Sequence, residues 1–278
     1  MKINAFSEKL LEINKNFCHD VPSMSRTHYF VDELVNFLFP IKTDKHDDIY
    51  DVNNKLHELK YQFRKLLIPL KPFLQREVEE ITDEFFTEII DIYFNLLHDA
   101  EVYHNSDPAS FCQEEVILCY PGYYSVMVYR FAHLLYKMKV PILPRVMSEY
   151  AHSKTGIDIH PGAIIGADFY IDHGTGIVIG ETVEIGKNVK IYQGVTLGAL
   201  YVEKNLANKK RHPTIQDNVI IYAGSTILGG NTVIGHDTVI GGNVWLTESV
   251  APFSVVYRQP KIIIRDSKDY TEPINFSI

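Results

Sequence analysis

An aliphatic residue returns at every sixth position through most of the second half of the chain. This spacing is neither the 3.6-residue period of an amphipathic helix nor the two-residue period of a simple strand, and it recurs too often for a single hairpin. Repeats of six residues build a parallel β-helix, in which three short strands form one triangular coil and stacking buries the repeated side chain. These residues are Ile159, Ile165, Ile171, Ile177, Ile179, Ile185, Ile191, Leu197, Ile215, Ile221, Ile227, Ile234, Ile240 and Leu246.

The use of glycine divides the chain into two parts. Fifteen of its sixteen glycines lie beyond residue 155, and Gly122 is the only earlier one. A chain of 278 residues also exceeds one average domain. We therefore expect an α+β protein with an α-helical domain at 1–153, to which the family resemblance given below adds a role in oligomerisation, a left-handed parallel β-helix at 154–262 and a flexible tail at 263–278.

Helical spacing of apolar residues predicts two helices in the first part, over 78–102 and 123–138. Pro121 and Gly122 precede the second stretch and are expected to break the chain there. Asp107 and Pro108 read as a helix start, with Asp107 as N-cap and Pro108 at the first helical position. Residues 1–75 are less legible, and we assign them no function.

Charge and cysteine usage limit the classes of function. The net charge of -8 gives no electrostatic reason to bind nucleic acid or an anionic membrane. The three cysteines form no CxxC pair and suit a reducing compartment, where we expect them to be buried thiols. No stretch has the length of a signal peptide core or a membrane span, so we expect a cytoplasmic protein.

The informative residues interrupt the six-residue repeat. Eight residues separate Ile171 from Ile179, and the extra pair falls in a polar stretch that contains Asp172 and His173. Asp158 lies fourteen residues before Asp172, two or three edges of the coils away, which is near enough in a stacked solenoid to reach His173. A second interruption, at 199–213, is too long to belong to the coil stack.

Four segments carry a resemblance to a known family. They read Asp-Ile-His-Pro at 158–161, Asp-His-Gly-Thr-Gly at 172–176, Arg-His-Pro at 211–213 and Ser-Asp-Pro-Ala at 106–109. Together they strongly resemble the serine O-acetyltransferases, over roughly residues 105–262. The resemblance implies transfer of acetyl from the co-substrate acetyl-CoA to the hydroxyl of L-serine, which gives O-acetyl-L-serine for cysteine biosynthesis.

The expected chemistry needs a base but neither a metal nor a covalent intermediate. A serine hydroxyl is a poor nucleophile at neutral pH, and a positioned histidine contributes on the order of 10² to 10⁴ in rate. By resemblance His173 is this general base, and it later returns the proton to the CoA thiolate. Asp158 would fix the imidazole tautomer and stabilise the imidazolium, although it could also simply cap the first coil.

The zwitterionic substrate requires two further charged groups. Asp107 and Asp172 can hold the ammonium, while Arg211 offers a planar fork for the carboxylate and His212 can add a hydrogen bond. Capping alone would also account for Asp107, and both roles can hold together. L-cysteine differs from L-serine by sulfur for oxygen, so the resemblance implies feedback inhibition by L-cysteine.

The contacts of CoA follow mainly from the resemblance. In the family the pantetheine arm lies in a groove between neighbouring solenoids, near positions that match Ala199 and Ala223. Lys210 and Lys261 could meet its phosphates, although Lys210 is also readily explained as part of a solvated loop. Two segments depart from the family, since the loop before Arg211 is longer and rich in lysine, and the usual G-x-P-A segment is replaced at 257–261.

Assembly and partners are also implied. A triangular solenoid has flat faces, so three chains around an axis can share composite sites, and in the family two trimers join as a hexamer. A terminal isoleucine in this family often inserts into O-acetylserine sulfhydrylase. Ile278 matches that ending, and an ordinary frayed tail is the alternative.

Two other classes of function stay open at this level. A hexapeptide transferase acting on a sugar or homoserine would not need the pairing of Asp172 with Arg211. A hexapeptide carbonic anhydrase would need three histidines around zinc, including a close pair that His160, His173 and His212 do not offer. A scaffold without transferase chemistry belongs to this last class.

Overall fold

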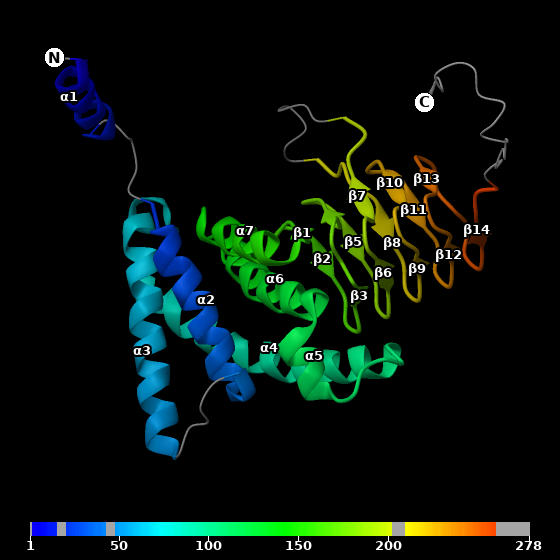
Figure 1. Cartoon of the computed structure of the whole chain (residues 1–278), viewed down its shortest axis with the longest axis horizontal. Coiled ribbons are helices and arrows are strands. Elements are labelled where there is room, and N and C mark those ends of the chain that lie inside the picture. The colour runs from blue at the N-terminus through cyan, green and yellow to red at the C-terminus, as the bar shows by residue number, and fades with distance from the viewer. Residues whose placement is uncertain (1, 16–20, 43–47, 202–208, 260–278) are drawn as a thin grey trace, which may run out of the picture.

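The computed structural model describes residues 2–15, 21–42, 48–201 and 209–259. Helices occupy the N-terminal part and a solenoid of short parallel strands occupies the C-terminal part (Figure 1). This arrangement confirms the predicted α+β class, a helical region followed by a left-handed parallel β-helix. No helix in the described part of the chain combines the length and apolarity needed to cross a membrane.

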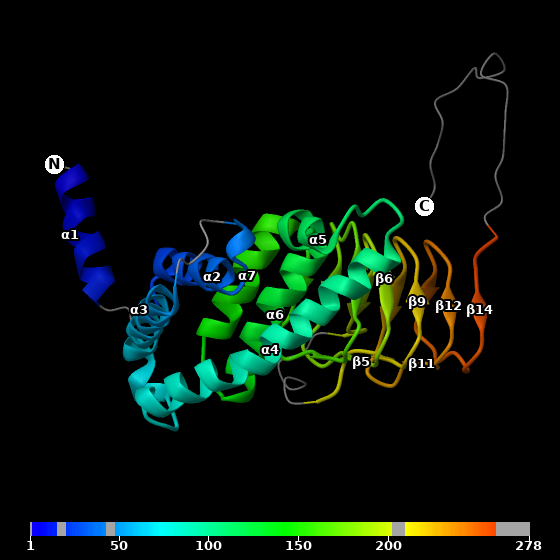
Figure 2. The same ribbon diagram turned by 90° about the horizontal axis from the view of Figure 1, so that it is seen from below.

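Most of the helices pack as a bundle at one end of the solenoid, and α4 extends from this bundle to the side of the coils (Figure 2). The buried residues of the bundle include Phe30, Phe63 and Phe85, whose rings contact one another. The helices are α1 (Lys2–Lys15), α2 (Met24–Leu38), η1 (Pro40–Lys42), α3 (Ile49–Leu67), η2 (Ile68–Phe73), α4 (Val78–Ser106), α5 (Gln113–Cys119), α6 (Pro121–Lys137) and α7 (Leu143–Thr155).

Local sequence explains where several helices begin and end. The Asp48 carboxylate accepts the backbone N–H groups of Tyr50 and Asp51 and so caps α3. Helix α7 ends at Thr155 because Gly156 adopts a left-handed conformation, with φ of 71°, that glycine enters without steric cost. The solenoid begins two residues later, at Asp158.

The strands form three parallel sheets, and each sheet takes every third strand. The first sheet has the order β1-β4-β7-β10-β13, the second β11-β8-β5-β2 and the third β14-β12-β9-β6-β3. The strands are β1 (Asp158–Ile159), β2 (Ile164–Ile165), β3 (Tyr170–Asp172), β4 (Val178–Ile179), β5 (Glu184–Ile185), β6 (Lys190–Tyr192), β7 (Thr196–Gly198), β8 (Thr214–Ile215), β9 (Ile220–Ile221), β10 (Thr226–Leu228), β11 (Val233–Ile234), β12 (Val239–Ile240), β13 (Trp245–Leu246) and β14 (Val255–Val256).

The repeated aliphatic residues fill the interior of the coils, as the sequence predicts. The structure adds a second set of inward residues, of which the six-residue pattern identified only Ile177. These lie two positions before the strand residues and include Ala163, Phe169, Ile177, Val183, Val189, Val195, Val219 and Val244. Each corner of the triangle thus contributes to the core, and Ile177 belongs to this second set because Ile179 is the strand residue of that coil.

Helices α4 and α6 join the bundle to the first coils by side chains that reach backbone groups. The hydroxyl oxygen of Tyr103 accepts the N–H of Ile171 at 3.0 Å, and the Tyr129 hydroxyl donates to the carbonyl of Ala163 at 2.6 Å. Gly122 allows the close approach of α6, because a Cβ there would lie 2.4 Å from the carbonyl oxygen of Ile171. The two parts of the chain therefore share a packed interface.

Three local predictions need correction. Asp107 is not an N-cap, because it follows the last residue of α4 and its carboxylate closes a turn onto the N–H of Ala109; the same side chain satisfies either geometry. Pro121 and Gly122 are not a break before a helix but form the first turn of α6, where proline needs no hydrogen bond. Cys112 is half-buried and Cys119 is exposed, so these thiols are not core residues; Cys18 lies outside the described residues.

We predict that Gly122→Ala destabilises the chain by about 2 kcal/mol, because the added methyl must push α6 away from the solenoid. Urea unfolding monitored by circular dichroism measures this change. Gly242→Ala is the matched control, since its Cβ would meet only the carbonyl oxygen of Ala223, at 3.3 Å. Equal stability of the two variants would contradict the prediction.

Candidate active site

His173 occupies the inserted pair of residues in the turn between the third and first sheets, here called the His173 corner (residues 173–177). In the coils above, the same turn is two residues shorter and uses Gly194 and Gly224. His173 has φ of 55°, and its side chain is 73% exposed. The insertion therefore lifts the imidazole out of the stacked coils toward solvent.

Two carboxylates flank this imidazole. The Nε2 atom of His173 lies 3.7 Å from Oδ1 of Asp172. Asp107 accepts a hydrogen bond from the Tyr120 hydroxyl at 2.6 Å and from the N–H of Ala109 at 2.8 Å. These two bonds, with a smaller contribution from the nearby His173, hold the pKa of Asp107 below its usual range. Asp107 and Asp172 thus provide negative charge around the imidazole.

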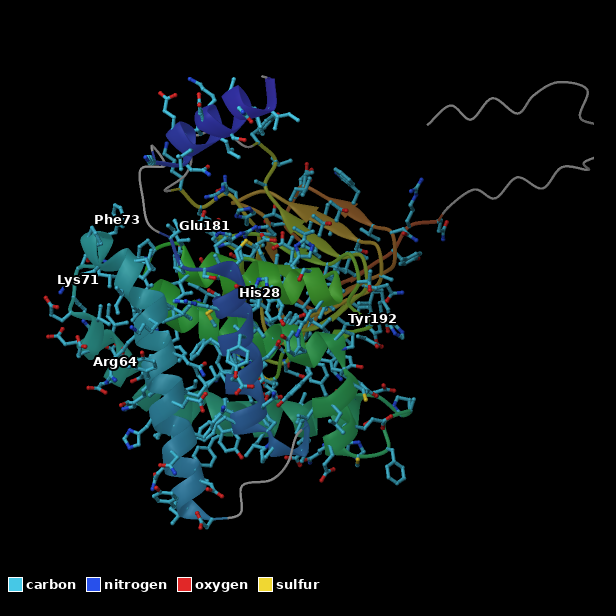
Figure 3. The ribbon with its side chains drawn as sticks, turned by 60° about the vertical axis from the view of Figure 1, so that its left-hand side comes forward. His28, Arg64, Lys71, Phe73, Glu181 and Tyr192 are labelled. Atoms are coloured by element: carbon cyan, nitrogen blue, oxygen red, sulfur yellow. The ribbon has the colours of Figure 1, made fainter. Side chains whose placement is uncertain are left out.

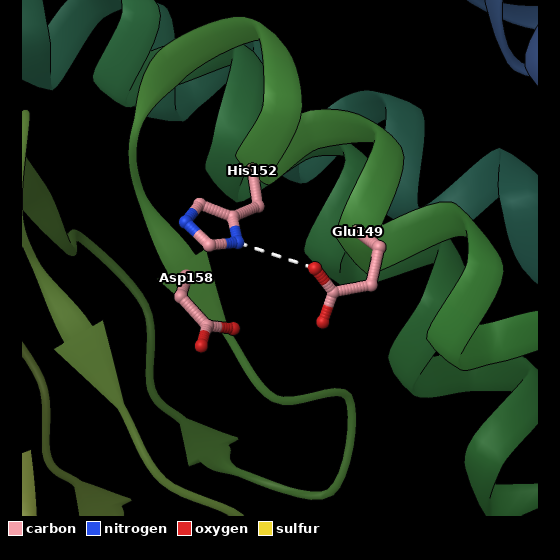
Figure 4. Close-up of side chains that lie close together, drawn as sticks. All are labelled: Glu149, His152 and Asp158. Atoms are coloured by element: carbon pink, nitrogen blue, oxygen red, sulfur yellow. Dashed lines mark hydrogen bonds and ion pairs between the residues drawn. The ribbon is translucent and has the colours of Figure 1, made fainter.

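The Asp158 side chain is turned toward helix α7 (Figure 4). It lies 3.9 Å from Arg145, which also contacts Glu149. Within the described residues, no hydrogen bond or ion pair joins Asp158 to His173. The backbone nevertheless brings the two segments together, because a Cβ on Gly174 would lie 2.4 Å from the Ile157 side chain.

Asp158 also belongs to a candidate metal-binding cluster within the described residues. Ligand atoms of Glu149, His152 and Asp158 all lie within 4.8 Å of one another. The Nδ1 atom of His152 is 3.2 Å from the Glu149 carboxylate. Because Arg145 contacts both carboxylates, a guanidinium already supplies positive charge to the cluster, and we assign no ion to it.

Arg211 and His212 lie in a different turn, between the first and second sheets. This turn, here called the Arg211 corner, comprises 180–183 and the segment before β8. The Arg211 guanidinium is ion-paired with Glu181, and the backbone N–H of Arg211 donates to Oγ1 of Thr182 at 3.0 Å. The corner borders a cavity of about 400 Å³ that Glu181 and Lys210 help to line.

The tautomer of His212 follows from its partners. Its Nδ1 atom accepts the backbone N–H of Thr182 at 3.1 Å, so the proton of the neutral ring resides on Nε2. Burial, together with the charge of Arg211, lowers the pKa of His212 to about 4. Gly180 provides the space for the ring, since a Cβ there would lie 2.2 Å from its atoms. His212 is therefore a neutral hydrogen-bond donor at neutral pH.

One chain does not bring its predicted substrate groups together. Asp172 is the last residue of β3, a strand of the third sheet, and His173 follows it. Arg211 and His212 instead precede β8, a strand of the second sheet. Figure 3 shows the separation, since Tyr192, the strand neighbour of Asp172, and Glu181, the partner of Arg211, lie at different edges of the solenoid. The residues predicted to bind the substrate ammonium and those predicted to bind its carboxylate thus lie at two different corners of one chain.

The predicted CoA residues divide in the same way. Ala199 follows β7 at the Arg211 corner, and Ala223 lies in the stack above the His173 corner, where its carbonyl accepts the N–H of Asn243. The Lys210 ammonium is engaged locally, at 2.9 Å from the Thr182 carbonyl and 3.0 Å from Glu184. Lys261 and Ile278 lie outside the described residues.

Sequence reasoning missed three residues that organise the site. Glu181 and Thr182 hold Arg211 and His212, and Tyr120 holds Asp107. Glu181 and Thr182 lie in the Gly-Glu-Thr segment at 180–182, shortly after the second motif, where the sequence could have signalled them. Tyr120 gives no such signal, because only the turn after α4 brings it to Asp107.

A parallel β-helix with an exposed histidine at an irregular corner defines the chain as a hexapeptide-type acyltransferase in its fold. No protein-family model matches the chain. Over 188 residues it is 46% identical to a plasmid-encoded serine acetyltransferase of Synechococcus elongatus, covering 66% of this chain and 59% of that protein. It is 42% identical over 186 residues to the serine acetyltransferase of Bacillus subtilis, covering 66% of this chain and 83% of that protein.

A solved structure extends the similarity to the helical part. Serine acetyltransferase 1 of Entamoeba histolytica in complex with L-cysteine superposes with a TM-score of 0.74 and 34% identity, covering 86% of this chain and 88% of that one. The chain therefore belongs to the serine acetyltransferase family.

The pKa of His212 predicts an acid-sensitive contribution to stability. The unfolded imidazole binds a proton near its ordinary pKa of 6.5, whereas the folded one does so only near 4. The stabilisation is therefore complete above pH 6.5 and is lost as the pH falls toward 4. The loss of unfolding free energy between pH 7 and pH 5 amounts to about 1–2 kcal/mol.

Urea unfolding of the parent and of His212→Gln at pH 7 and pH 5 measures this contribution. We expect the variant to lose less stability on acidification than the parent, because it lacks this histidine. The pKa values of His133 and His160 are also lowered by burial, but these residues stay in both proteins. Equal losses in parent and variant would refute the assignment.

Proposed function

We propose that this chain is a serine O-acetyltransferase, which transfers acetyl from acetyl-CoA to L-serine and releases O-acetyl-L-serine and CoA. The observation that carries the proposal is the exposed His173 near Asp107 and Asp172, in a corner that is two residues longer than the same corner in the next coils. Membership of the serine acetyltransferase family supports the same activity and its place in cysteine biosynthesis.

In the proposed mechanism His173 acts as general base. Its neutral imidazole takes the proton of the serine hydroxyl while the oxygen attacks the thioester carbonyl. The tetrahedral intermediate then collapses, the bond from carbon to sulfur breaks, and the imidazolium gives its proton to the CoA thiolate. Asp107 and Asp172 hold the substrate ammonium, which brings the hydroxyl next to the ring.

We propose Asp158 as the orienting carboxylate, acting once both substrates are bound. The contact of Gly174 with Ile157 supports this role, because it sets the His173 turn against the segment that leads into Asp158. Rotation about the side-chain bonds of Asp158 would carry its carboxylate from Arg145 toward the imidazole. Its charge would then stabilise the imidazolium formed during proton transfer.

The remaining contacts are proposed to come from a neighbouring chain. Arg211 and His212 of one chain would hold the carboxylate of a serine bound at the His173 corner of the next, and CoA would lie in the groove between Ala199 and Ala223 of the two chains. The separation of the two corners within one chain supports this arrangement. It requires a homotrimer, which the helical part would join into a hexamer.

Three further parts of the proposal concern ligands and partners. L-cysteine would compete with L-serine because it carries the same ammonium and carboxylate, and a relative in this family has been solved in complex with L-cysteine. Phosphate contacts from Lys210 and Lys261, and binding of a sulfhydrylase by Ile278, remain proposals that rest on the sequence. So does a cytoplasmic location.

The primary test measures thiol release from acetyl-CoA with L-serine, L-homoserine and amino sugars offered in parallel. We expect L-serine to be preferred, and His173→Ala to lower kcat by about 10² to 10⁴ because the proton then has no acceptor. His236→Ala is the matched control, since His236 also lies at a solenoid corner beside a carboxylate, 2.7 Å from Asp237. Preference for another acceptor, or full activity of His173→Ala, would overturn the assignment.

Complementation tests the shared site. His173→Ala and Arg211→Ala chains are each expected to be nearly inactive alone. After unfolding and refolding together in equal amounts, random trimers should regain about a quarter of the parental sites, because one interface in four pairs an intact His173 with an intact Arg211. Recovery no greater than the sum of the two variants would show that each chain completes its own site.

A further inference from the structure

Helix α6 reaches the Arg211 corner through its last turn. The hydroxyl of Tyr136 donates to Oε1 of Glu181 at 2.9 Å, and its ring lies edge-on to His160 with centroids 6.0 Å apart. Tyr136 belongs to the helical part, whereas Glu181 lies in the turn between β4 and β5. A side chain of the bundle therefore touches the part of the solenoid that carries Arg211.

Glu181 uses its two carboxylate oxygens for different partners. Oε1 accepts the hydrogen bond from Tyr136, and Oε2 accepts one from Nη2 of Arg211. The carboxylate thus connects the phenol to the guanidinium. Since the N–H donors of an arginine side chain lie in one plane, the bond to Glu181 restrains the orientation of that plane.

Gly162 makes room for this connection. A Cβ at this position would lie 2.9 Å from Cγ of Glu181, 2.9 Å from Cζ of Tyr136 and 3.0 Å from the Tyr136 hydroxyl. The absence of a side chain at Gly162 therefore lets Tyr136 and Glu181 meet.

The charges favour the same arrangement. Burial raises the pKa of Glu181, but the hydrogen bonds from Arg211 and Tyr136 outweigh burial and leave this pKa below its usual range. Burial and the hydrogen bond to Glu181 raise the pKa of Tyr136, so the phenol keeps its proton. At neutral pH a neutral donor, an anion and a cation are thus held in sequence.

We propose that Tyr136 is a positioning residue for substrate binding, which acts through Glu181 to fix the direction of the Arg211 guanidinium. This inference rests on the proposed role of Arg211 as the ligand of the amino-acid carboxylate. Removing the hydroxyl frees one oxygen of Glu181, so the guanidinium loses a fixed partner. Binding of both L-serine and L-cysteine should weaken, because both present a carboxylate to Arg211, whereas proton transfer at the His173 corner should not.

The test compares Tyr136→Phe with Tyr129→Phe. Tyr129 is the matched control because it lies on the same helix and also loses a hydrogen bond to the first coil, its donation to the Ala163 carbonyl. For Tyr136→Phe we expect the KM for L-serine and the inhibition constant of L-cysteine to rise together by about three- to tenfold, the range of one lost hydrogen bond. The kcat and the KM for acetyl-CoA should change less than twofold.

Tyr129→Phe should lower the midpoint of urea unfolding and leave both amino-acid constants unchanged. Gly162→Ala should reproduce the pattern of Tyr136→Phe, because its methyl group separates Tyr136 from Glu181, and L-cysteine binding by calorimetry gives the same comparison without turnover.

Unchanged amino-acid constants in Tyr136→Phe, or an equal rise in Tyr129→Phe, would overturn the positioning role. Failure of the parental enzyme to acetylate L-serine would instead overturn the proposed function.

Discussion

The stacking register of the coils is the constraint on which the rest of the structure depends. Backbone hydrogen bonds join each coil to the next at equivalent positions, as from Gly194 to Thr175 and from Gly224 to Gln193. A stack held in this way cannot absorb two extra residues within its strands, because the residues that follow would move past their hydrogen-bonded partners in the neighbouring coils. The insertion must therefore leave the stack at a corner, and it does so at His173. The register also resumes after the longer interruption, where Thr214 pairs with Glu184.

The helical part completes both corners by one type of contact, a tyrosine hydroxyl that donates to a carboxylate. Tyr120 donates to Asp107 beside His173, and Tyr136 donates to Glu181 beside Arg211. A phenol suits this role because it stays neutral when half-buried, so it can orient an anion without neutralising it. The pKa of Tyr120 is raised to about 12 by burial and by Asp107. The bundle therefore orients site carboxylates as well as capping the solenoid.

The sequence predicts the coil stack well because a buried interior imposes its period directly on the residues. It also predicts which polar segments leave the stack, since an interrupted period marks His173 and the segment before Arg211. It fails where the same residue suits two geometries, as with Asp107, whose carboxylate can cap a helix start or close the turn after a helix end. It fails again for contacts between distant segments. Nothing in the spacing places Tyr136 beside Glu181 or Asp158 beside Arg145.

The two histidines proposed for the site differ because their surroundings differ. The His212 ring is buried, receives the N–H of Thr182 on Nδ1 and lies beside Arg211, and these conditions all favour the neutral form with its proton on Nε2. Such a ring donates a hydrogen bond but makes a poor base, because accepting a second proton would place a buried cation next to the guanidinium. His173 is 73% exposed and lies 3.7 Å from the Asp172 carboxylate, so a ligand can reach its ring from solvent. Burial and neighbouring charge therefore suit His212 for donating a hydrogen bond, whereas exposure leaves the His173 ring open to a ligand, although the two side chains are chemically identical.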